Sequence, residues 1–107
     1  NGVTIEDGFI IVDFGAKYLV TDRSGDDLTV HLTNSESYSV SVHYDIDKII
    51  DDEGIDLGSG SGTESFDLNG AIDSARWVRI DAGSSASPSL DAVEAEPREF
   101  PTGIIPV

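Results

Sequence analysis

The clearest feature of the sequence is a set of short segments in which apolar and polar residues alternate. Residues 28–32 and 38–44 alternate in this way, as expected for strands with one buried face. The short polar connection 34–37 lies between them. A connection this short favours pairing of the two segments as an antiparallel hairpin.

Further apolar segments extend the pattern over most of the chain. Residues 9–14 and 17–21 contain runs of apolar residues, which predicts more deeply buried strands. Three later strands, each bounded by Gly, Ser or Pro clusters, are predicted at residues 65–68, 76–80 and 90–95. Seven or more short strands at close spacing predict an all-β fold, an antiparallel β-sandwich.

Helical alternatives are weak, because every candidate window is broken by glycine or is rich in β-branched and turn residues. The best window, residues 45–52, would form only about two turns. The glycine-rich residues 58–62 are predicted to be a loop, since two halves of a 107-residue chain would be too small to fold alone. We therefore expect a single β-sandwich domain over residues 1–96 and an extended, proline-punctuated tail over residues 97–107.

Charge narrows the possible functions. The chain has 21 Asp and Glu against 6 Lys and Arg, a formal net charge of -15, which repels nucleic acids and anionic membranes. We expect no nucleic-acid partner, and no membrane insertion of the chain as given, because no run of 18 apolar residues occurs. The absence of cysteine excludes disulfides and thiol chemistry. The excess of aspartate suits high salt or a calcium-containing exterior.

Calcium is the cation that the acidic turns would suit, because it takes six to eight oxygen ligands. Carboxylates gather at residues 22–27, at residues 45–56, and at Asp91 with Glu94. Asp91 would share a strand face with Val93 and Ala95, and if that face points inward its carboxylate needs a cation, an arginine or backbone donors. The open alternative is that these acids solvate turns or pair with Arg76 or Arg79.

Catalysis is not expected. His31 and His43 lie on strands predicted to be adjacent, but their neighbours lack the spacing of zinc ligands, so exposed structural roles are expected. No nucleophile-elbow motif lies between a strand and a helix. A sandwich of this size offers little cleft for paired catalytic carboxylates. The sequence therefore predicts that the protein is not an enzyme.

Aromatic residues give one candidate for ligand binding. Trp77 could stack on a sugar, although aromatics in the middle of strands more often belong to the core. The remaining aromatics lie on apolar stripes and are expected in the core: Phe9, Phe14, Tyr18, Tyr38, Tyr44 and Phe66.

The most distinctive strands are residues 75–80, Ala-Arg-Trp-Val-Arg-Ile, and residues 90–95, Leu-Asp-Ala-Val-Glu-Ala. With the segments before them, they resemble the discoidin-like jelly-roll domains of archaeal and bacterial cell-surface proteins over most of residues 9–95. Residues 45–56 are longer and more acidic than that pattern. The resemblance implies a structural calcium between a last-strand acid and an early loop, and the candidate ligands are Asp22, Asp26, Asp27 and Asp91.

The end of the chain carries a second resemblance. Residues 99–107, Glu-Phe-Pro-Thr-Gly-Ile-Ile-Pro-Val, are similar to the start of the archaeal PEF-CTERM sorting signal. Arg98 stands where that signal usually has proline, and no apolar segment follows Val107 in this chain. The similarity implies an exported archaeal protein located at the cell surface or outside the cell.

These inferences predict a structural subunit of an archaeal extracellular filament, sheath or surface layer that acts by association with copies of itself. The tail would add to a neighbour's sheet through Phe100, Thr102, Ile104 and Ile105. The alternative is that the tail packs against its own sandwich. Rival functions are a carbohydrate-binding or adhesion module that recognises surface glycans, and a calcium-stabilised spacer domain of a surface protein.

Overall fold

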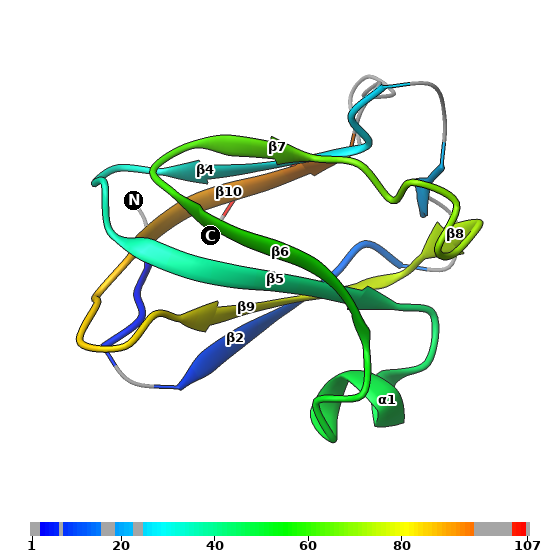
Figure 1. The fold of residues 1–107 in the computed structure, drawn as a ribbon, viewed down its shortest axis with the longest axis horizontal. Coiled ribbons are helices and arrows are strands. Elements are labelled where there is room, and N and C mark those ends of the chain that lie inside the picture. Colours follow the sequence, from blue (N-terminus) through cyan, green and yellow to red (C-terminus); the bar gives the residue numbers. More distant parts are fainter. Residues whose placement is uncertain (1–2, 7, 16–18, 23–24, 96–103, 107) are drawn as a thin grey trace.

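The computed structural model describes residues 3–6, 8–15, 19–22, 25–95 and 104–106. It confirms the all-β fold, in which two antiparallel sheets pack face to face in one compact sandwich (Figure 1). The elements in chain order are β1 (Val3–Thr4), β2 (Phe9–Asp13), β3 (Val20–Thr21), β4 (Leu28–Leu32), β5 (Ser37–His43), α1 (Ile46–Ile50), β6 (Ile55–Ser61), β7 (Glu64–Phe66), β8 (Ser74–Ala75), β9 (Trp77–Ala82), β10 (Ser89–Ala95) and β11 (Ile104–Pro106).

The strands form two main sheets and a small third one. Sheet A has the order β1-β10-β4-β7, and β11 also pairs with β10. Sheet B has the order β2-β9-β5-β6, and β3 pairs with β8 at one end of the sandwich (Figure 1). Sheets A and B therefore form the two layers, and α1 lies outside sheet B.

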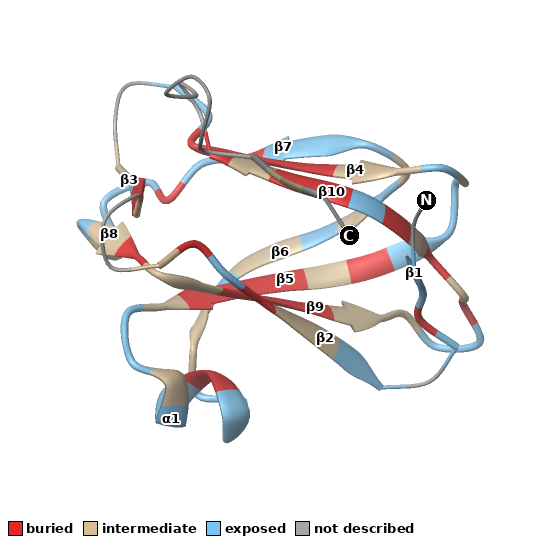
Figure 2. Cartoon of the chain, turned by 180° about the vertical axis from the view of Figure 1, so that it is seen from behind, coloured by how far each residue is buried: buried red, intermediate tan, exposed pale blue. Residues whose placement is uncertain are grey.

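The core lies between the two sheets, where apolar residues of the central strands β4, β10, β5 and β9 are buried (Figure 2). Val30 and Val93 of sheet A and Val40 and Ile80 of sheet B belong to this core and are inaccessible or nearly so. Burial of side chains of this kind contributes roughly 1.5 to 3 kcal/mol each. The alternation seen in the sequence is thus the pattern that holds the two layers together.

The predicted hairpin between residues 28–32 and 38–44 is wrong. β4 pairs with β10 and β7 in sheet A, whereas β5 pairs with β9 and β6 in sheet B, so the connection crosses from one layer to the other. Asn34 ties this crossing to residues 87–89, because its amide donates to the Ser87 carbonyl at 3.1 Å and accepts from the Ser89 N–H at 3.1 Å. These side-chain bonds add to the backbone bond from the Thr33 N–H to the Ser89 carbonyl at 3.0 Å, which holds the start of the link.

The predicted loop over residues 58–62 is also corrected, since residues 55–61 form β6, an edge strand of sheet B. Gly58 has a φ of +114° beside a register irregularity at Val40 and Ser41 of β5, and glycine adopts this backbone without strain. The weak helix window contains α1, which Asp45 caps by accepting from the Asp47 N–H at 3.0 Å.

The end of the described chain, residues 104–106, is part of the sandwich, whereas the rest of the expected tail, residues 97–103 and 107, lies outside the described residues. β11 pairs with residues 92–94 of β10 in the same chain, and Ile105 packs against the core. Pairing within the subunit, the alternative considered for the tail, is found for the backbone of residues 104–106, and the Ile105 side chain packs within the subunit. Phe100 and Thr102 lie outside the described residues.

Candidate functional site

Three aspartates come together at one end of the sandwich. Asp22 follows β3, Asp27 precedes β4, and Asp67 follows β7. One carboxylate oxygen from each lies within 4.8 Å of the other two. Two separate connections, before β4 and after β7, thus bring like charges to one place, and we call these residues the aspartate cluster.

The turn after β7 supplies backbone donors to the aspartate cluster. Asp27 is fully buried and accepts a hydrogen bond from the Leu68 N–H at 2.9 Å. Asp22 accepts from the Gly70 N–H at 2.9 Å. Residues 69 and 70 both have positive φ angles, 54° and 74°, and this backbone turns the N–H groups back toward the carboxylates.

The chemistry of the aspartate cluster suits a hard cation. Three carboxylate oxygens this close together could serve as ligands to a divalent cation such as calcium, which binds oxygen ligands. Asp22 and Asp27 were candidates from the sequence, and they are indeed brought together. Asp26 is exposed and is not part of the cluster.

Asp67 was missed, although the pairing of strands could have identified it. Phe66 of β7 lies opposite Leu28 of β4, so the residues that flank this pair, Asp27 and Asp67, are also neighbours. The Asp27 N–H donates to the Phe66 carbonyl at 2.8 Å, which extends the ladder to this point. The pattern of apolar and polar residues does not indicate that β4 pairs with β7 rather than with β5.

The expected inward position of Asp91 is wrong. The register of β10 with β4 is irregular between Leu90 and Ala92, and Asp91 at this point is exposed while both neighbours are buried. The irregularity carries the carboxylate out of the inward face, where it would have lacked a partner. Asp91 is therefore not part of the aspartate cluster.

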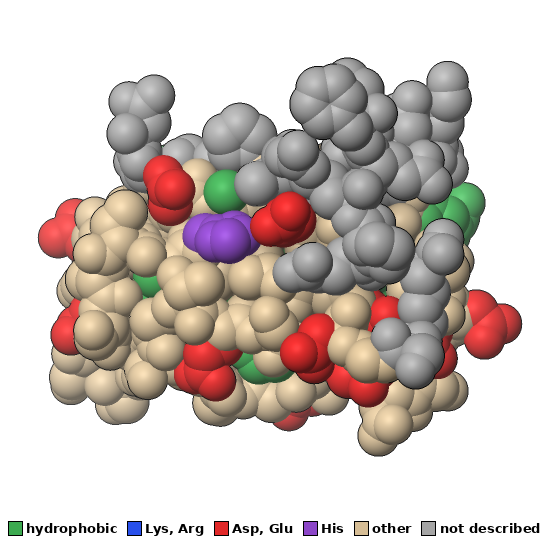
Figure 3. All heavy atoms as spheres, turned by 90° about the horizontal axis from the view of Figure 1, so that it is seen from above, with side chains coloured by type: hydrophobic (Ala, Val, Ile, Leu, Met, Phe, Trp, Pro, Cys, Tyr) green, Lys and Arg blue, Asp and Glu red, His purple; other side chains and the backbone are tan. Residues whose placement is uncertain are grey.

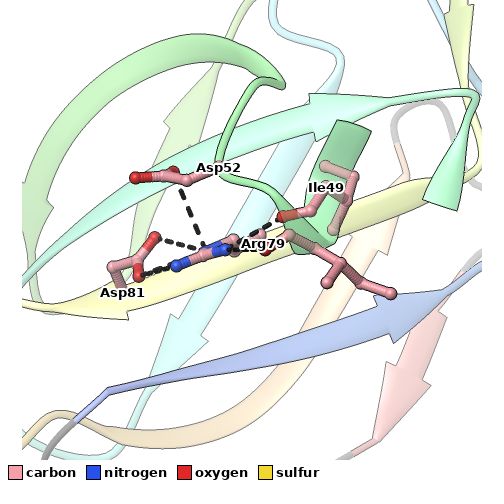
Figure 4. Close-up of polar contacts among 5 residues, drawn as sticks. Ile49, Asp52, Arg79 and Asp81 are labelled. Atoms are coloured by element: carbon pink, nitrogen blue, oxygen red, sulfur yellow. Dashed lines mark hydrogen bonds and ion pairs between the residues drawn. The ribbon is translucent and has the colours of Figure 1, made fainter. Parts of the chain in front are cut away.

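A second polar group lies on the outer side of sheet B, centred on Arg79 (Figure 4). Arg79 is buried, and its Nε and Nη2 both donate to Asp81 at 3.0 Å, while its Nη1 donates to the carbonyl of Ile49 in α1 at 2.9 Å. Its guanidinium lies 3.7 Å from the centre of the Phe9 ring. The hydrogen bonds to Asp81 raise the pKa of Arg79 above its usual value. Arg79 thus joins α1 to the sheet.

Arg76 forms a similar pair with Asp13 at the end of β2. Its Nε and Nη2 donate to the two carboxylate oxygens at 2.8 and 3.1 Å. The bond from Arg76 is the main cause that lowers the pKa of Asp13. The same guanidinium lies 4.7 Å from the Trp77 ring, and Trp77 sits opposite Asp13 and His43 in the sheet. Sugar stacking by Trp77 stays a prediction.

The aromatic residues divide between core and surface. Phe14, Tyr38 and Phe66 are buried as predicted, but Phe9 and Tyr44 are 46% and 50% exposed. Phe9 lies on the outer face of an edge strand and Tyr44 follows the end of β5, so neither faces the second sheet. Tyr18 lies outside the described residues.

The two histidines are in different sheets, so their predicted adjacency is wrong. His31 Nε2 lies 2.9 Å from a carboxylate oxygen of Glu94 on the neighbouring strand β10. The outer face of sheet A shows a histidine with acidic side chains beside it (Figure 3). His43 Nδ1 accepts from the Asp45 N–H at 2.9 Å, next to the cap of α1.

Two further results concern the whole chain. Among the described residues, none of the helices has the length and apolar character needed to cross a membrane. No protein-family model, curated protein or solved structure matches the chain. The resemblances to a discoidin-like domain and to a sorting signal therefore remain predictions from the sequence.

Proposed function

We propose that this chain is a structural subunit of an archaeal extracellular surface assembly and acts by associating with copies of itself. The observation that supports this role is the edge of sheet B. β2 is an apolar edge strand that pairs only with β9 within the described part of the chain. An apolar edge strand with free backbone groups is a template for pairing with another chain.

The side chains outside the core favour a structural role over a reactive one. Arg76, Arg79 and His31 each contact a carboxylate of the same chain. Each of these pairs joins neighbouring strands or residues and so stiffens a sheet. The extracellular and archaeal setting rests on the two sequence resemblances.

Sedimentation velocity on the 107-residue chain tests this function. The sedimentation coefficient should rise with protein concentration and reach values above that of a monomer. Electron microscopy of the associated material should show filaments or sheets. A protein that remains monomeric at every concentration and in high salt would contradict self-association.

A second candidate function is a calcium-stabilised spacer domain, and the aspartate cluster favours it. Calcium at one hundred times its dissociation constant should raise the free energy of unfolding by about 2.7 kcal/mol. Melting temperatures in calcium and in chelator, at equal ionic strength, measure this effect. The spacer function also requires a monomer, so sedimentation distinguishes the two candidates.

Two exposed aspartates provide a matched pair of variants for this calcium experiment. Asp67→Asn removes one charge from the aspartate cluster, whereas Asp26→Asn removes one charge next to it. We expect Asp67→Asn to lose most of the calcium-dependent rise in melting temperature and Asp26→Asn to keep it. Equal responses of the two variants would show that calcium acts only by general screening.

A further inference from the structure

The backbone N–H and C=O groups of β2 point alternately toward β9 and away from it. The hydrogen bonds at the two ends of the β2–β9 pair show which residues point toward β9. The Phe14 N–H donates to the Arg76 carbonyl at 2.9 Å, and the Ala82 N–H donates to the Gly8 carbonyl at 3.0 Å. The register between these ends is continuous. The direction of the backbone N–H and C=O groups alternates along an antiparallel strand. The backbone groups that point toward β9 are therefore those of residues 8, 10, 12 and 14.

The backbone groups of Phe9, Ile11 and Asp13 consequently point away from β9, toward the open edge of sheet B. Within the described residues, no hydrogen bond engages the backbone N–H of Phe9 or Ile11. Each of these residues offers one donor and one acceptor along the edge. The edge can therefore take up another strand without loss of any existing bond.

This edge lacks the features that usually prevent strand addition. β2 contains no lysine, proline or register irregularity, and its one charged residue, Asp13, is paired with Arg76. The opposite edge strand β6 lies beside an irregularity at Gly58 and carries Asp56. Charges and irregularities such as those of β6 protect an edge strand from pairing with another chain. Of the two edges of sheet B, β2 is the one suited to association.

The distribution of charge identifies a second copy as the partner. A chain of net charge -15 repels its copies over most of its surface. Residues 9–12 are uncharged, however, and Asp13 at the end of the strand is paired with Arg76. On the neighbouring strand β9, Asp81 is paired with Arg79. Two copies can thus approach through β2 with little repulsion.

We propose that β2 of one copy pairs antiparallel with β2 of a second copy, about a two-fold axis at Ile11. This contact rests on the proposed self-association and gives its first step, because a two-fold contact closes a dimer and a filament or sheet then needs a further contact between dimers. Ile11 would lie opposite Ile11 of the other copy, and Phe9 opposite Asp13. Three residues in each copy face the edge, so the pairing would form about six backbone hydrogen bonds. Two sheets B would become one continuous sheet.

The variant Ile11→Pro tests this contact directly. Proline removes the N–H at the centre of the proposed interface, and an edge position whose N–H faces solvent tolerates it. We expect this variant to stay monomeric under conditions in which the wild-type chain associates. The control Ile11→Thr keeps the backbone N–H and a β-branched side chain, and should still associate.

The variant Ile11→Cys gives an independent test that also holds if proline unfolds the chain. The wild-type chain has no cysteine, and a hydrogen-bonded antiparallel pair has a Cα separation of about 5.5 Å, within the range of a disulfide. We expect oxidation to convert Ile11→Cys into a disulfide dimer. Val3→Cys, on exposed β1, should remain largely uncrosslinked.

The outcomes separate the two proposals. If the wild-type chain is monomeric throughout, self-association as a whole is wrong, and the β2 contact with it. If the wild-type chain associates but Ile11→Cys does not crosslink, or folded Ile11→Pro still associates, the function stands and the β2 contact is overturned.

Discussion

At the level of single residues, Tyr38 shows how burial of one side chain limits stability at alkaline pH. Tyr38 is 1% exposed, its ring packs edge-on against Phe66, and its hydroxyl donates to the Gly62 carbonyl at 2.7 Å. Burial, with a smaller effect from the charge of Glu64, raises the pKa of Tyr38 to about 12. The folded protein therefore keeps a proton that the unfolded chain loses above about pH 10.

This difference in pKa predicts a loss of stability in alkali. The contribution of Tyr38 is fully present below the unfolded pKa of about 10 and is lost as the pH rises toward 12. At about pH 11 the loss should be about 1.4 kcal/mol, measured by urea unfolding. Tyr38→Phe should flatten this dependence, whereas Tyr44→Phe, at a half-exposed position, should not. Parallel curves for wild type and Tyr38→Phe would contradict the assignment.

The aspartates show how far residue-level prediction from the sequence could reach. The acidic segment 22–27 contained Asp22 and Asp27, which the fold brings together, while calcium binding by them stays a prediction. Asp91 was misplaced, because a single irregularity in β10 reverses the direction of a side chain. Such an irregularity leaves no mark in an alternating pattern of apolar residues. The position of Asp67 depended on which strands are neighbours, and composition does not carry this information.

At the level of elements, alternation predicted most strands but not their neighbours. β4 and β5 each bury one face in the same core, and that requirement is met equally by two strands of one sheet or by strands of opposite sheets. The four polar residues between them therefore allowed either a hairpin or a crossing. The glycines of residues 58–62 likewise did not prevent the formation of β6, because its backbone pairs with the neighbouring strand β5.

β11 provides an element-level prediction. Ile105 packs against the core and pairs with Val93, so Ile105→Ala should lower the free energy of unfolding by about 1 to 2 kcal/mol. This is below the cost at a fully buried site, because Ile105 is partly exposed. Ile50→Ala, at a 54% exposed position on α1, should change stability by less than about 0.5 kcal/mol. Urea unfolding measures both variants.

The same variant distinguishes the two roles considered for the end of the chain. If β11 serves only its own sandwich, Ile105→Ala should be less stable but should associate as the wild type does. A loss of association with unchanged stability would instead indicate that the tail contributes to the interface between copies.

At the level of the whole molecule, charge opposes every contact between copies. Three of the described cations are paired with acids of the same chain, so they reduce the negative field only locally. The proposed association is therefore expected on the β2 side of sheet B, where the pairs Arg76–Asp13 and Arg79–Asp81 and uncharged residues lie. The remaining surface contributes repulsion that depends on ionic strength.

This balance predicts that association strengthens with salt. Raising NaCl from about 10 mM to about 150 mM shortens the Debye length from about 30 Å to about 8 Å. The repulsion between two copies then falls, while backbone hydrogen bonds and apolar contacts along β2 change little. The dissociation constant from sedimentation should accordingly decrease over this range. Urea unfolding of monomeric Ile11→Pro in the same buffers measures the effect of salt on folding stability alone, so that it can be separated from the effect of salt on association. A dissociation constant that increases with salt would instead indicate attraction between opposite charges, which an uncharged edge cannot provide.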